Sequence, residues 1–92
     1  NIKKIKSELR SEMMAVVAGI IEDVKEVTTK KGDRMAFLRV ADFSDNIEVV
    51  VFPKTFVEYK NIIVQDKCVA IKGRMSDRNG TMSIITENIK EL

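Results

Sequence analysis

The chain has 92 residues, the size of a single domain, and no apolar run approaches the length that spans a membrane, so we expect no membrane partner. Its 16 basic and 14 acidic residues leave a net charge of only +2, and any sign of a partner must therefore lie in how the charges are distributed. One cysteine and no histidine exclude an internal disulfide and the common zinc sites, so we expect no cofactor and a reducing, cytoplasmic location.

The first 13 residues predict a short helix that leads into the domain. In "NIKKIKSELRSE", Ile2, Ile5 and Leu9 recur at helical spacing with basic residues between them. The sequence starts at Asn1 without an initiator methionine, from which we expect a piece cut from a longer protein. We therefore predict an N-terminal linker or helix over residues 1–13 and one domain over residues 14–92.

Two strands are predicted next, joined by a turn. "MAVVAGIIEDVKEVTT" is rich in Val and Ile and longer than an average strand, and Gly19 suggests a bend or bulge within it. "KKGD" at 30–33 predicts a turn. "RMAFLRVAD" at 34–42 then alternates, which predicts an inward set and an outward set. The outward set places Phe37 on an exposed face beside Arg39; the inward set is Ala36, Leu38 and Val40.

A third strand and a helix follow the turn "FSDN" at 43–46. "IEVVVF" at 47–52 is almost wholly apolar, and such a run does not determine which side faces inward, so alternation alone leaves the direction of Phe52 open. Pro53 suits the first position of a helix, which "PKTFVEYKNII" continues. Aromatic residues here are more often core than surface, and we expect Phe52, Phe56 and Tyr59 to be mostly core.

Two further strands complete the domain. "KCVAIKGRM" at 67–75 predicts a fourth strand with Val69 and Ile71 inside and Cys68 buried or half-buried. "SDRNG" at 76–80 predicts a hairpin turn that leads into a fifth strand. Five strands in so short a chain favour a closed barrel, because closure removes strand edges. We predict an all-β, five-stranded Greek-key barrel with one helix between strands three and four.

The cations concentrate around two of these turns. Residues 24–39 contain five basic and two acidic residues, and residues 66–78 contain four basic and two acidic residues. In the five-stranded oligonucleotide/oligosaccharide-binding (OB) fold, the loops at these two positions flank the ligand face of strands two and three. An aromatic ring among cations is typical of single-strand binding. The candidate contact residues are Lys25, Lys30, Lys31, Arg34, Phe37, Arg39, Lys72, Arg74 and Arg78.

Most of the chain resembles a known family. "VAGIIEDVKEVTTKKGDRMAFLRVADFSDNIEVVVFPKTFVEYKNII" and the later "VAIKGRMSDRNG" resemble the OB domain of the bacterial DNA polymerase III alpha subunit, over about residues 16–89 and most specifically over 28–53. The resemblance implies a module that contacts single-stranded template through its basic loop, here Lys25, Lys30, Lys31 and Arg34. It also implies that the partners are single-stranded DNA, other domains of the parent polymerase and replisome subunits.

Two other functions remain open. The strand pattern is also similar to the anticodon-binding OB domains of class II aminoacyl-tRNA synthetases, which would bind RNA instead of DNA. A barrel that only docks another protein is the third possibility, with its charges serving solubility. The sequence contains no nucleophile–base pair, phosphate-cradling glycine loop or metal-ligand spacing, so we do not expect the fragment itself to be an enzyme.

Overall fold

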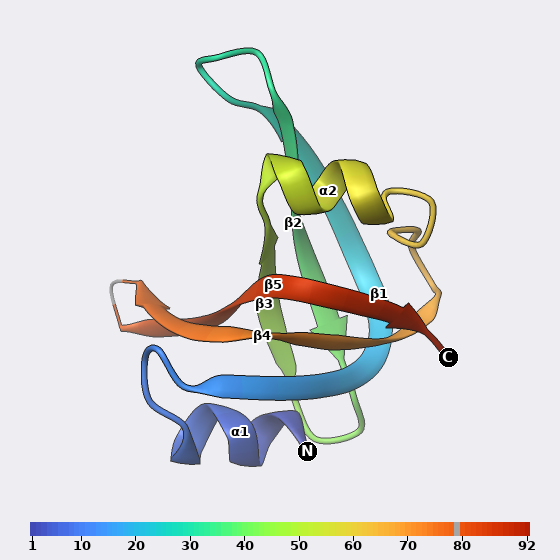
Figure 1. Cartoon of the computed structure of the whole chain (residues 1–92). Coiled ribbons are helices and arrows are strands. Elements are labelled where there is room, and N and C mark those ends of the chain that lie inside the picture. Colours follow the sequence, from blue (N-terminus) through green and yellow to red (C-terminus); the bar gives the residue numbers. More distant parts are fainter. Residues whose placement is uncertain (79) are drawn as a thin grey trace.

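The computed structural model describes residues 1–78 and 80–92 and forms a closed five-stranded barrel with two short helices (Figure 1). The strands are adjacent in the order β1-β2-β3-β5-β4, with β3 and β5 parallel and the other pairs antiparallel. This arrangement confirms the predicted fold, including the helix between the third and fourth strands. In chain order the elements are α1 (Ile2–Glu8), β1 (Met14–Thr28), β2 (Arg34–Ala41), β3 (Asn46–Val51), α2 (Pro53–Tyr59), β4 (Cys68–Arg78) and β5 (Thr81–Glu91).

Strand β1 bends so that it belongs to both halves of the barrel. Its residues 14–20 pair with β4, and its residues 20–28 pair with β2 (Figure 1). The β1–β2 register shifts between Ile21 and Asp23, which marks a bulge at the bend. At Gly19 a Cβ atom would lie 2.2 Å from the carbonyl oxygen of Ala41. The predicted bend is therefore present, and the glycine allows β2 to approach the strand at that corner.

Alternation along the strands builds most of the barrel interior and is clearest on β2. On β2, Ala36, Leu38 and Val40 are fully buried, as the sequence predicted, whereas Phe37 is half-buried and Arg39 is exposed. Val49 and Val51 point into the barrel, so alternation places Val50 on the outside, and yet Val50 is also buried. It lies on the outer side, where its register partners on β2 and β5 cover it. The core also includes Val17, Ile21, Ile47, Val69, Ile71, Met75, Ile84 and Ile89.

Two predictions about burial are wrong. Phe56 is buried and Tyr59 half-buried, as expected, but Phe52 is 46% exposed. The reason is that β3 ends at Val51 and Phe52 continues its extended backbone as the N-cap of α2, with φ −68° and ψ 162°. Alternation therefore directs the Phe52 ring outward. Cys68 is exposed as well, because it begins β4 on the side opposite to the buried Val69.

Helix α1 packs against the barrel beside the turn between β2 and β3 (Figure 1). Ile2 is buried in the core, and its N–H donates a hydrogen bond of 2.8 Å to Oδ2 of Asp42. The Ser44 hydroxyl donates to Oδ1 of the same carboxylate at 2.6 Å. These hydrogen bonds, that of Ser44 above all, hold the pKa of Asp42 below its usual range. Neither helix in residues 1–78 and 80–92 is long and apolar enough to cross a membrane.

Candidate functional site

A shallow groove of ≈ 490 Å³ receives one side chain from each of the five strands. A smaller depression of ≈ 120 Å³ shares three of these side chains and extends toward Asp23 and Arg39. We call the two together the β2–β3 groove. Residues far apart in the sequence are brought together here because the barrel closes. The larger depression is lined by Lys25, Phe37, Glu48, Arg78 and Thr81.

A row of outward side chains crosses the strands and passes through the β2–β3 groove at Lys25 and Phe37. Lys25 of β1 is the register partner of Phe37 on β2, which in turn is the partner of Val50 on β3. The row continues from Val50 to Ile85 of β5 and then to Arg74 of β4. Directly opposite side chains lie roughly 4.5–5.5 Å apart at Cβ. The row is therefore apolar in the middle and has a cation at each end.

Phe37 presents its ring to the groove from outside the barrel. It is half-buried, because Val50 packs beside it, and the rest of the ring contacts solvent in the groove. Arg39 lies two residues along the same face of β2, and its Nη1 donates a hydrogen bond of 3.0 Å to Oδ1 of Asn46. This places an aromatic surface and a guanidinium next to each other, as the alternation of β2 predicted.

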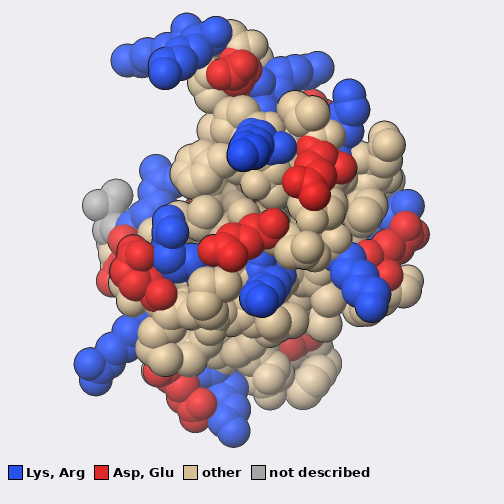
Figure 2. Space-filling model, in the orientation of Figure 1, with Lys and Arg blue, Asp and Glu red and all other residues tan. Residues whose placement is uncertain are grey.

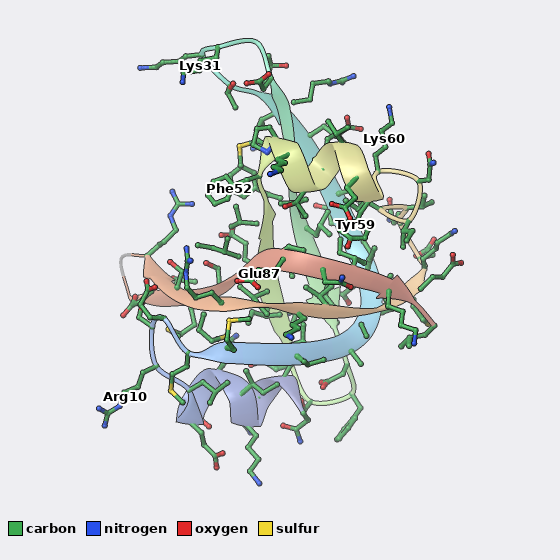
Figure 3. All side chains as sticks on the ribbon, in the orientation of Figure 1. Arg10, Lys31, Phe52, Tyr59, Lys60 and Glu87 are labelled. Atoms are coloured by element: carbon green, nitrogen blue, oxygen red, sulfur yellow. The ribbon has the colours of Figure 1, made fainter. Side chains whose placement is uncertain are left out.

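The connection between β1 and β2 carries two of the candidate cations. Lys30 and Lys31 are exposed at its tip, where Gly32 adopts φ +91° and Thr29 N–H donates to the Asp33 carbonyl oxygen at 2.7 Å. Basic side chains cover this tip, and further ones lie where β4 and β5 protrude (Figure 2). The Lys31 side chain extends toward the side on which those strand ends protrude (Figure 3). The turn predicted at 76–80 starts too early in the chain, because β4 continues to Arg78, which pairs with Thr81 of β5. Asn79 of that turn lies outside the described residues.

Arg34 does not share the face of Phe37. It has the same alternation as Ala36, so it lies on the other side of the ribbon formed by β1 and β2. There its Nη2 is 3.4 Å from Oε1 of Glu26. Because the ribbon separates the two faces, Arg34 and the Phe37 ring cannot contact the same part of a ligand lying in the groove.

The basic residues of β4 are spread along that strand. Arg78 lines the groove, whereas Arg74 lines neither depression and has its Nε 3.2 Å from Oε2 of Glu12. Lys72 is further along β4, between its register partners Val16 of β1 and Asn88 of β5, and it lines neither depression. The structure thus gathers Lys25, Phe37, Arg39 and Arg78 around one groove. Lys30 and Lys31 lie beyond it, in the connection between β1 and β2, whereas Arg34 and Lys72 do not line it.

Three residues at this surface were not among the sequence candidates. Glu48 and Thr81 line the groove. Phe52 lies at the start of α2 (Figure 3), two residues along the chain from Val50, the register partner of Phe37. Alternation along β3 places Glu48 and Phe52 on one face, which is the signal in the sequence that groups them with this surface. Within residues 1–78 and 80–92, no three carboxylate or thiol side chains gather as a metal site.

Sequence comparisons show which known proteins the chain is similar to. Residues 15–92 match the family described as OB-fold nucleic acid binding domain. A DNA polymerase III subunit alpha from Aquifex aeolicus is 37% identical over 83 residues, which cover 90% of this chain. The match covers only 7% of that protein, so the chain corresponds to a small part of its relative.

Solved structures with low sequence identity share the fold. A mitochondrial single-stranded DNA binding protein from S. cerevisiae superposes with a TM-score of 0.72 at 16% identity, over 90% of this chain and 96% of that one. An asparaginyl-tRNA synthetase from Pyrococcus horikoshii gives a TM-score of 0.72 at 18% identity, over 98% of this chain and 22% of that one. At these identities the likeness concerns the barrel alone.

Proposed function

Since the chain belongs to the OB-fold nucleic acid binding domain family, we propose that it is a non-catalytic, single-stranded DNA-binding module of a bacterial DNA polymerase III alpha subunit. The observation that supports this most directly is the groove in which Lys25, Phe37 and Arg78 come together from three strands. Polymerisation itself would belong to the rest of such a polymerase, whose other domains and replisome subunits are the protein partners we propose.

The groove suits a strand whose bases are unpaired. A base stacked on the Phe37 ring gains roughly 1–3 kcal/mol, and this gain requires a free base face, which a duplex hides. The phosphates would lie along the rim, where Lys25, Arg39 and Arg78 are close to the ring and Lys30 and Lys31 extend the track. Each neutralised phosphate adds a salt-dependent contribution.

Glu48 supports the assignment of bases to the floor and phosphates to the rim. Its carboxylate lies in both depressions beside Phe37, and it forms no ion pair or hydrogen bond with the described residues. A carboxylate repels a phosphate but not a base. A single strand of nucleic acid in this groove would therefore place its bases over Glu48 and its phosphates near the cations.

RNA is the second candidate ligand, supported by the likeness to the synthetase barrel. Both nucleic acids supply stacking bases and phosphates, and they differ at the 2′-hydroxyl. Titration with DNA and RNA strands of equal length and matched bases separates them. Tighter binding of the RNA strand by tenfold or more would favour the anticodon-type reading over the polymerase module.

The deciding experiment is a titration of the domain with a fluorescent oligo-dT at several salt concentrations. With about three to five phosphates contacted, log affinity should fall with log salt at a slope of about −2 to −3.5. The variant with Lys30→Glu and Lys31→Glu should bind more weakly and with a shallower slope. Undetectable binding at millimolar protein, or an affinity that does not depend on salt, contradicts the proposal. If the RNA strand does not bind either, protein docking is the function that is left.

A further inference from the structure

Phe52 is an exposed aromatic side chain that the proposed function does not use, and it lies two residues after Val50, the register partner of Phe37. A single exposed apolar residue is ordinary on protein surfaces. The position of Phe52 is what distinguishes it, because it immediately follows β3 on the outward side and precedes Pro53, which restricts its backbone. The chain also offers a comparison: Phe43, 92% exposed, lies in the turn between β2 and β3 beside α1.

The strand register places Phe52 in the row next to Phe37. Phe37 pairs with Val50, and the next pair is Ala36 with Val51. One residue further, the extended backbone of Phe52 continues past Met35, whose partner on β1 is Val27. This second outward row lies between the row of Phe37 and the connection that carries Lys30 and Lys31. In Figure 3 the Phe52 side chain lies beside the start of α2, on the side toward which Lys31 extends.

We propose that Phe52 is a second base-stacking residue, so that a single strand runs from Arg78 over Phe37 and then Phe52 toward the lysines at 30 and 31. This inference rests on the proposed function and adds a second base position to it. Diagonal neighbours on adjacent strands lie roughly 7–8 Å apart. That is about twice the 3.4 Å between stacked bases in a duplex strand. The two bases are therefore separated from each other, each on its own ring.

The test compares Phe52→Leu with Phe43→Leu in the titration with an eight-nucleotide oligo-dT. Leucine keeps much of the apolar surface but has no aromatic face. Phe52→Leu should weaken binding about 5- to 100-fold, the range expected for losing one stacked base. Its salt slope should stay unchanged, because no phosphate contact is lost. Phe43→Leu should bind like the unmodified chain, since its ring lies in the turn beside α1, away from the groove.

Two further measurements isolate stacking from other effects. A strand of eight abasic sites should bind equally to the unmodified chain and to Phe52→Leu, because it offers phosphates without bases. Phe52→Trp should restore or strengthen binding of oligo-dT, because the indole is also a stacking surface. If Phe52→Leu lowers binding of the abasic strand as much as that of oligo-dT, or if Phe52→Trp is as weak as Phe52→Leu, the ring does not stack on a base.

The outcomes distinguish this inference from the function on which it rests. If the unmodified chain binds no oligonucleotide, the proposed function itself fails. If the chain binds, Phe37→Leu weakens binding and Phe52→Leu behaves like Phe43→Leu, then the groove binds DNA and Phe52 is not part of it. Because Phe52 lies outside the core, its variants should keep the thermal midpoint of the unmodified chain, which a melting curve verifies.

Discussion

Lys25 of β1 and Phe37 of β2 are register partners on the outer face of the barrel, and both line the same groove. Arg34 of β2 is only three residues from Phe37 but lies on the opposite side of the ribbon, paired with Glu26. Two cations that look equivalent in a count of charges therefore occupy different surfaces. This difference leads to the first prediction.

Lys25→Gln should weaken binding of oligo-dT, whereas Arg34→Gln should change it much less. Each substitution removes one positive charge, but only Lys25 is beside the ring. We expect Lys25→Gln to lower the magnitude of the salt slope by about 0.7, the value for one phosphate of a single strand. Fluorescence anisotropy at four salt concentrations measures both quantities. Equal losses for the two variants would show that overall charge, and not the groove, determines binding.

Glu48→Gln should strengthen binding. The substitution removes a negative charge from the groove floor and keeps the size of the side chain, so the phosphates at the rim meet less repulsion. We expect an increase of about two- to tenfold at low salt that shrinks at high salt because of screening. The matched control is Glu87→Gln, an exposed acid on β5 that lines neither depression (Figure 3). An unchanged or lower affinity for Glu48→Gln would place the phosphates away from it.

Gly19→Ala should destabilise the barrel at its corner. A Cβ atom at this position would lie 2.2 Å from a backbone oxygen of β2, and backbone cannot move aside as a flexible side chain can. We expect the free energy of unfolding to fall by about 1–3 kcal/mol or more, as measured by urea denaturation.

The neighbouring Ala18→Gly is the control for the glycine substitution. Ala18 is exposed on the same strand, and its change should cost at most about 1 kcal/mol, through backbone entropy. If the two variants unfold at the same urea concentration, β1 and β2 are further apart at this corner than the structure has them.

Acid should weaken the attachment of helix α1. The pKa of Asp42 is lowered in the folded chain by the Ser44 hydroxyl and the N–H of Ile2, and that of Asp45 is lowered by the N–H of Asn46 and by Lys6. A lowered folded-state pKa stabilises the fold above the unfolded value of about 3.9, and this stabilisation is lost as the pH falls below it. We therefore expect the thermal midpoint to decrease between about pH 5 and 2.

Asp42→Asn tests the cause of that pH dependence. The amide cannot ionise, so this variant should be less stable than the unmodified chain at pH 7 and should lose less stability on acidification. Thermal melts monitored by circular dichroism at several pH values measure both effects. A variant that keeps the full pH dependence would assign it to carboxylates elsewhere in the chain.

The sequence by itself determined what depends on local periodicity. Alternation along "RMAFLRVAD" predicted that Ala36, Leu38 and Val40 face inward and that Phe37 faces outward. Turn residues predicted the connections after the first two strands, whereas β4 continues into the turn predicted at 76–80. The same alternation already separated Arg34 from Phe37, although a count of cations did not use it. These features could be read from the chain because each side chain of a strand points opposite to the one before it.

Only the tertiary structure decided which strands meet and where each face ends. The parallel pairing of β3 with β5 joins Val50 to Ile85, and the barrel curves so that Arg78 reaches the groove while Lys72, on the same face of β4, does not. The exposure of Phe52 depends on β3 ending at Val51, so that Phe52 becomes the N-cap of α2 on the outward side. Alternation with a period of two residues is the same for any pairing of strands, so it cannot predict which strands pair to close the barrel.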